Sequence, residues 1–241
     1  MRVGLVSDVH GNLEALEAVL AAIPTDVPLL SLGDLVGYGP DPGAAIDALR
    51  PRLQAAVLGN HDVAAIDGYG LELFNPVARE ALEWTRRALE PSHVAWLDGL
   101  AYEIRMPDYL MVHGMPVDYF RYLLDKGDAK AAFAATDAPL VFVGHTHLAE
   151  YYALRPDGVI EHGERASGGG LALEPGWRYV VNPGSVGQPR DCNPEAAYAF
   201  YDRQSSTVSW QRVPYAIATV RAKIVAAGLP AACGARLAVG R

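Results

Sequence analysis

Five short apolar segments of this chain each end where a glycine lies beside aspartate, asparagine or histidine. The five junctions read Ser7-Asp8-Val9-His10-Gly11, Gly33-Asp34, Gly59-Asn60-His61-Asp62, His113-Gly114 and Gly144-His145-Thr146-His147. The first three apolar segments are followed by loops or helical patterns, which predicts a layer of parallel strands. Ligands bind at the carboxyl ends of strands in open α/β sheets, so we expect all five junctions to converge on one crevice.

The hydrophobic periodicity predicts an α/β (α+β) fold with two packed sheets and helices outside them. We expect strands at 2–6, 29–32, 53–58, 101–105, 109–112, 140–143, 150–154, 158–161, 178–181, 197–202 and 207–213. Helices are expected at 12–23, 42–49, 129–135 and 216–227, with a helical insertion near 68–100. The chain has neither an internal repeat nor a linker, which favours a single domain over 1–241. From about residue 228 it is rich in Ala and Gly, and we expect a loosely held tail.

The charge balance, 20 basic against 28 acidic residues, disfavours nucleic acid and anionic membranes as partners. Bound cations can still reverse the potential inside one cleft, so a small anionic substrate is compatible with this charge. Cys192 and Cys233 are not spaced like metal or redox pairs, which indicates free thiols in a reducing compartment. Without a signal sequence or an apolar stretch of about 20 residues, we expect a cytoplasmic protein, while its oligomeric state stays open.

The polar residues of the junctions have the character of metal ligands. Five of the seven histidines lie in these segments, and only His93 and His162 lie elsewhere. Asp8 and His10 are two residues apart, as are His145 and His147, which in an extended segment places both side chains on one side. Imidazole, carboxylate and amide oxygen together suit Mn²⁺, Fe²⁺, Zn²⁺ or Ni²⁺.

The seven candidate ligands are Asp8, His10, Asp34, Asn60, His113, His145 and His147. They exceed the needs of one four-coordinate ion, but two ions about 3.5–4 Å apart would use them all. Asp34 is the natural bridge between the ions, since an isolated carboxylate can offer one oxygen to each. Taken singly, each residue has an ordinary alternative: a histidine in the core, or an aspartate that caps a helix or forms a turn.

The ordered set of junctions resembles the five blocks of the calcineurin-like metallophosphoesterase superfamily. Asn182-Pro183-Gly184-Ser185 and the Gly37-Tyr38-Gly39-Pro40-Asp41-Pro42 stretch further resemble small bacterial members, including phosphodiesterases and dinucleoside-polyphosphate hydrolases. The resemblance implies a four-layer α-β-β-α sandwich. It assigns Asp8, His10 and His147 to one ion, Asn60, His113 and His145 to the second, and Asp34 to both. Manganese is the favoured metal.

By the same resemblance His61 faces the substrate and either donates a proton to the leaving group or stabilises it electrostatically, while Asp34 serves both ions during catalysis. The implied reaction is in-line attack on phosphorus by a metal-bound hydroxide. Asp62 either orients a neighbour or caps a helix. Arg190 is a candidate for binding a substrate phosphate. Aromatic residues near the junctions are candidates for stacking on a base, with core packing as the alternative: Tyr38, Tyr69, Phe74, Tyr119 and Phe120.

Two departures from relatives bear on the substrate. Protein phosphatases of this superfamily carry an Asp and an Arg after Gly-Asp, whereas here Leu35-Val36-Gly37 follows Gly33-Asp34. Met115-Pro116-Val117 stands where small relatives often carry Ser-Pro-Arg. We therefore expect hydrolysis of a small phosphodiester or a nucleotide-type phosphoanhydride. The alternatives are a phosphomonoesterase acting on small molecules or proteins, and a non-catalytic protein-binding scaffold of the same fold.

Overall fold

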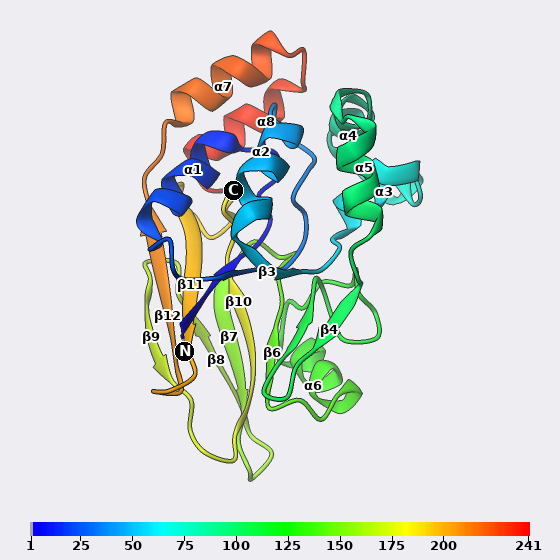
Figure 1. The fold of residues 1–241 in the computed structure, drawn as a ribbon. Helices are drawn as coiled ribbons and strands as arrows, with labels where there is room; N and C mark the ends of the chain where they lie inside the picture. The colour runs from blue at the N-terminus through cyan, green and yellow to red at the C-terminus, as the bar shows by residue number, and fades with distance from the viewer. Residues whose placement is uncertain (1) are drawn as a thin grey trace.

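The computed structural model describes residues 2–241 and contains two six-stranded mixed sheets with eight α-helices around them (Figure 1). The first sheet has the order β3 (Leu53–Ala56), β2 (Leu29–Ser31), β1 (Arg2–Val6), β11 (Ala196–Asp202), β12 (Thr207–Val213) and β9 (Gly169–Ala172). The second has the order β4 (Glu103–Arg105), β5 (Leu110–Val112), β6 (Leu140–Phe142), β10 (Arg178–Pro183), β7 (Ala149–Leu154) and β8 (Ile160–Glu164).

The helices are α1 (Leu13–Ala22), α2 (Pro42–Leu49), α3 (Asn60–Asp67), α4 (Pro76–Ala88), α5 (Pro91–Asp98), α6 (Lys126–Ala135), α7 (Ile217–Ala226) and α8 (Ala231–Ala235). Short 3-10 turns occur at Arg50–Arg52, Leu71–Leu73 and Arg236–Ala238. In Figure 1, α1, α2, α7 and α8 form one group and α3, α4 and α5 a second, while α6 lies apart from both. None of the helices in residues 2–241 combines the length and the hydrophobicity that crossing a bilayer requires.

Parallel pairing brings the carboxyl ends of the motif-bearing strands together. In the first sheet β1, β2 and β3 are mutually parallel, and in the second sheet β5, β6 and β10 are. β11 lies antiparallel beside β1, and β7 lies antiparallel beside β10. All five sequence junctions therefore leave the sheets from ends that belong to parallel strands, as the strand–loop pattern predicts.

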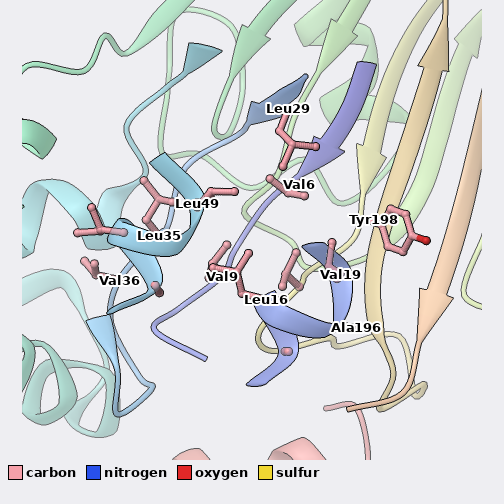
Figure 2. Close-up of a cluster of buried hydrophobic side chains, with 14 of the residues drawn as sticks. Val6, Val9, Leu16, Val19, Leu29, Leu35, Val36, Leu49, Ala196 and Tyr198 are labelled. Atoms are coloured by element: carbon pink, nitrogen blue, oxygen red, sulfur yellow. The ribbon is translucent and has the colours of Figure 1, made fainter. Parts of the chain in front are cut away.

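Successive side chains along each strand point to opposite faces of the sheet, so apolar residues build a core on both faces of each sheet. Leu5 of β1 and Met111 of β5 point into the layer between the sheets, whereas Val6 and Val112 point outward. On the outer face of the first sheet, Leu16 and Val19 of α1 pack with Val6, Leu29, Leu49 and Tyr198 (Figure 2). On the outer face of the second sheet, Phe133 of α6 packs with Val112 and Val143. The order helix, sheet, sheet, helix confirms the predicted four-layer sandwich.

Three local predictions need correction. The structure adds strand β9, which glycine-rich sequence conceals, and helix α3, which begins at Asn60 where a strand-end loop was expected. The predicted tail is not loosely held, because Leu229, Cys233 and Leu237 are buried in one cluster with Tyr38, Val220 and Ile224. Burying these apolar side chains stabilises the segment in spite of its many small residues. The segment predicted to be a helical insertion, 68–100, contains α4 and α5.

Candidate metal centre

Hydrogen bonds between main chains hold the motif loops together. Asp8 N donates to Gly33 O and His10 N donates to Asp34 O, each at a distance of 3.0 Å. Gly144 N donates to His113 O at 2.7 Å, and this hydrogen bond joins the loops after β5 and β6. Two side chains connect the sheets and loops further, since His145 N donates to Asp8 Oδ2 at 3.2 Å and His61 N to Asp34 Oδ1 at 2.9 Å. The five junctions thus form one rigid, buried site.

Potential ligand atoms gather in two groups that share one carboxylate. Asp8, His10, Asp34 and His147 form the first group, and Asp34, His113 and His145 form the second, with the atoms of each group within 4.8 Å of one another. Asp34 Oδ2 lies 3.7 Å from His10 Nε2 and 3.3 Å from His113 Nε2. Six of the seven predicted ligands therefore lie together, with Asp34 in the position of a bridge.

The hydrogen bonds of the histidines determine which ring nitrogen is free. His10 Nδ1 lies 3.0 Å from Val36 O, and His147 Nδ1 lies 2.6 Å from Gln188 O. A carbonyl oxygen only accepts hydrogen bonds, so each Nδ1 carries the proton and each Nε2 has a lone pair. Burial lowers the pKa of His10 to about 3 and that of His147 well below its usual range, which keeps both rings neutral.

These lone pairs face one another and have no donor between them. His10 Nε2 lies 3.2 Å from His147 Nε2, and His147 Nε2 lies 3.2 Å from Asp8 Oδ1. Asp8 Oδ1 is buried and without a hydrogen-bond partner. Three acceptors that converge in a buried space are mutually repulsive, and a cation placed among them would satisfy all three. The donor set fits a divalent transition-metal ion.

Similar unsatisfied atoms lie in and beside the second group, where Asn60 lines the same cavity as His145. Asn60 Oδ1 and His145 Nε2 are both buried without a partner. His113 Nδ1 lies 2.7 Å from Leu32 O, so its Nε2 faces Asp34 Oδ2 and, at 3.1 Å, His145 Nδ1. Burial opposes a charge on His113, but the carboxylate of Asp34 outweighs it and raises the His113 pKa to about 9. A cation at this place would take over the role of that proton.

The polypeptide holds the ligands in a strained conformation. Asp8, His10, Asp34, His145 and His147 all have positive φ, between 49° and 67°. Left-handed backbone is uncommon outside glycine and costs of order 1–3 kcal/mol per residue, so the surrounding packing must enforce it. The assumption of extended segments, from which we expected Asp8 and His10 to share a side, is therefore wrong. The side chains of Asp8 and His10 converge because the backbone of their loop adopts the left-handed conformation.

Gly59 shows why a glycine is required between β3 and α3. A Cβ at this position would lie 2.0 Å from Asp34 Oδ1 and 2.3 Å from Asp34 N. Gly59 is also the N-cap of α3, and its amide donates to Asp62 Oδ2 at 3.0 Å. Asp62 is therefore not the N-cap but the N3 residue of a capping box, and its Oδ1 also accepts from Val36 N at 3.2 Å, which ties the second and third loops together.

His61 belongs to neither ligand group. Its side chain is buried, and its ring packs 4.7 Å from the ring of His10, 4.6 Å from that of Tyr38 and 4.8 Å from that of Phe74. Burial lowers the His61 pKa well below its usual range, and Nδ1 has no hydrogen-bond partner. The imidazole is thus neutral and adjacent to the ligands.

The end of β10 and the loop after it support the ligands from outside, which only a weak resemblance to relatives suggested in sequence. Asn182 Nδ2 donates to Gly144 O at 2.8 Å and to Thr146 Oγ1 at 2.9 Å, on either side of His145. Ser185 Oγ donates to Asp8 O at 2.8 Å. Arg190 N donates to His147 O at 3.3 Å, so this residue lies beside a ligand loop, and its contact with a substrate phosphate stays a prediction.

A cavity of about 260 Å³ opens beside the second ligand group. Its walls include Tyr38, Asn60, His61, Tyr69, Leu73, Phe74, Phe120, Tyr122 and His145. Four of the five aromatic residues proposed for base stacking thus line it, whereas Tyr119 packs against Tyr102 with a centroid distance of 5.6 Å. Tyr122, which sequence reasoning missed, stacks on His145 at 3.9 Å. The aromatic composition of 119–122 was the available signal.

The remaining histidines have structural partners away from the ligands. His93 Nε2 lies 3.3 Å from Asp47 Oδ1, and His162 Nε2 lies 2.7 Å from Glu150 Oε2. The structure therefore agrees with the sequence analysis, which separated the five motif histidines from these two by their positions in the chain.

Comparisons with known proteins agree with the fold and the ligand geometry. The sequence profile of the calcineurin-like phosphoesterase superfamily domain matches residues 1–206. An uncharacterised protein of Methanocaldococcus jannaschii is 31% identical over 255 aligned residues, covering 99% of this chain and 98% of its own length.

Two solved structures match the whole chain. A metallophosphoesterase from Sphaerobacter thermophilus superposes with a TM-score of 0.88 at 41% identity, covering 100% of this chain and 99% of its own. A hypothetical protein from Pyrococcus horikoshii shares the fold with a TM-score of 0.81 at 19% identity, covering 100% and 98%. With two acceptor-rich groups around a shared carboxylate, and with a profile match over most of its length, the chain belongs to the calcineurin-like phosphoesterase superfamily and is a metallophosphoesterase.

Proposed function

We propose that this enzyme hydrolyses a small phosphodiester or a nucleotide-type phosphoanhydride at a centre of two divalent transition-metal ions, with manganese favoured. Asp8, His10 and His147 would hold one ion, Asn60, His113 and His145 the other, and Asp34 both. When bound, such ions lower the pKa of a water molecule to near neutrality and neutralise charge on phosphoryl oxygens. The two unpaired cysteines support a reducing compartment such as the cytoplasm.

The aromatic cavity beside the second ligand group is the observation that carries this proposal. Asn60, His61 and His145 form its polar edge, and Tyr69, Leu73 and Phe74 form an apolar wall. Tyr69 and Leu73 expose 73% and 85% of their surface, so they are available to a ligand. A diester or a nucleotide has a second, organic substituent to fill such a space, whereas the smallest phosphomonoesters would leave it empty.

His61 has the position expected of the group that assists the leaving alkoxide. It lies on the cavity edge, outside both ligand groups. Asp34 Oδ1 accepts from His61 N, so the bridging carboxylate also orients the helix turn that carries this ring. A positioned imidazole that protonates the leaving group, or stabilises its charge by a hydrogen bond, accelerates such reactions by about 10²–10⁴-fold.

A turnover panel with added Mn²⁺ tests the proposal. We expect bis-p-nitrophenyl phosphate or diadenosine tetraphosphate to be hydrolysed with a kcat/KM at least about tenfold above that of p-nitrophenyl phosphate. A preference for the monoester would make the enzyme a phosphomonoesterase. Bound metal with no turnover of any of the three would favour the non-catalytic scaffold.

A further inference from the structure

The loop that follows His113 folds back across the second ligand group. Gly114 N donates to Tyr119 O at 2.7 Å, which turns the chain immediately after the ligand. At the far end of the loop, Leu123 is 3% exposed and packs in an apolar cluster with residues of α6. Tyr122 lies between these two anchors, so its main chain is held in place beside the site.

Tyr122 covers the ring of a candidate metal ligand. Its own ring lies 3.9 Å from the ring of His145, with an angle of 15° between the two planes. This centroid distance is shorter than that of any other aromatic pair in residues 2–241. His145 is 4% exposed and Tyr122 is 43% exposed, and both line the aromatic cavity. A single phenol ring therefore contacts a ligand histidine and also borders the cavity.

His145 differs from the other three candidate ligand histidines in the way its ring is held. In His10, His113 and His147 the Nδ1–H donates to a main-chain carbonyl at 2.6–3.0 Å. In His145, Nδ1 faces His113 Nε2 at 3.1 Å, and Nε2 is buried without a partner in the part of the chain that the structure describes. No carbonyl or carboxylate of that part therefore sets the orientation of the His145 ring.

We infer that Tyr122 is a positioning residue, which fixes the plane of the His145 imidazole so that Nδ1 faces the second ligand group. The inference rests on the second ion of the proposed function, and it is independent of the substrate. A ligating histidine is usually oriented by a hydrogen bond from its other ring nitrogen. Here a stacked aromatic ring takes that role, because tilting the imidazole would lose the contact between the two ring faces. The phenol hydroxyl takes no part in this stack, so phenylalanine should replace tyrosine.

Titration of the full-length, metal-depleted protein with Mn²⁺, followed by the electron paramagnetic resonance of free Mn²⁺, tests this role. We expect Tyr122→Leu to weaken one of the two Mn²⁺ affinities about fivefold and to leave the other within about twofold of wild type. Tyr122→Phe keeps the stacked ring and should retain both affinities. Tyr102→Leu is the matched control, since Tyr102 is also 43% exposed and stacks on Tyr119 of the same loop. This control should leave both affinities unchanged.

Nuclear magnetic resonance of histidine-labelled protein reads the same ring in the absence of metal. Because the face of an aromatic ring shields nearby protons, the His145 ring protons should move downfield in Tyr122→Leu and stay in place in Tyr122→Phe. The inference is overturned if Tyr122→Leu keeps both affinities, if Tyr122→Phe loses as much as Tyr122→Leu, or if the His145 signals do not respond. A wild-type protein that binds only one Mn²⁺ would refute the two-ion proposal, while the His145 signals would still decide whether Tyr122 holds the ring.

Discussion

Asn182 offers a direct test of how residues outside the ligand set position the metal centre. The side chain is 2% exposed, and its Nδ2 donates to Gly144 O and Thr146 Oγ1 while its Oδ1 accepts from Gly184 N at 2.9 Å. Asn182→Ala removes all three bonds and leaves Gly144 O, next to His145, without this donor. Hydrogen bonds contribute about 0.5–1.5 kcal/mol each, so the two that touch the ligand loop contribute about 1–3 kcal/mol.

If that energy serves to hold His145 and His147 in place, its loss appears as weaker metal binding. At about 1.4 kcal/mol per factor of ten, we expect Mn²⁺ affinity to fall between about 5-fold and 150-fold. This range overlaps the 10–100-fold loss that is typical when a supporting hydrogen bond to a metal ligand is removed. Titration of the metal-depleted protein with Mn²⁺, followed by the electron paramagnetic resonance of free Mn²⁺, measures the affinity.

Asn193→Ala is the matched control for this experiment. Asn193 Nδ2 donates to Ala166 O at 2.9 Å and its Oδ1 accepts from Glu195 N at 3.0 Å, so a similar set of bonds is lost without a contact to the ligand loops. We expect Asn193→Ala to keep wild-type affinity for Mn²⁺. Unchanged affinity in Asn182→Ala, or equal losses in both variants, would refute the argument that Asn182 acts by positioning the ligands.

Further predictions concern the bridge, the proton donor, the cavity and the thiols. Asp34→Asn should leave at most one tightly bound Mn²⁺ per chain by elemental analysis; two retained ions would rule out a bridge. His61→Ala should lower kcat by about 10²–10⁴-fold with metal content unchanged, and loss of metal would contradict its assignment. Leu73→Ser should raise KM for bis-p-nitrophenyl phosphate several-fold, whereas Val225→Ser, at a residue also exposed (70%), should not. Burial raises the pKa of Cys233 to about 11, so at pH 8 about one in 10³ of these thiols is ionised. A thiol reagent should therefore titrate only the exposed Cys192 until denaturant is added, and the pH must approach 11 before Cys233 reacts. Rapid reaction of both thiols at pH 8 would show that Cys233 is accessible.

Local sequence patterns were sufficient for much of the architecture. The strand at β1, the helix at α2 and most other elements follow from apolar periodicity, and α1 is capped by Asn12, whose Oδ1 accepts from Ala15 N. The patterns failed where local signals were weak or conflicting. Glycines conceal β9, and the polar Asn60-His61-Asp62 run hides the start of α3, which is stabilised by the contacts of Asp62 with two loops.

The sequence alone determined which residue types stand at the five strand ends and in what order, because these depend only on composition and short spacing. The tertiary structure decided what those residues can do together. His10 meets His147 across 137 positions of chain, and the Nδ1 partners that leave their lone pairs free are carbonyls of Val36 and Gln188. Such contacts join segments that are distant in sequence, and the left-handed backbone at the ligands exists only because surrounding packing enforces it. The placement of Leu237 beside Tyr38 likewise follows from the packing of the C-terminal helices, which no local pattern reports.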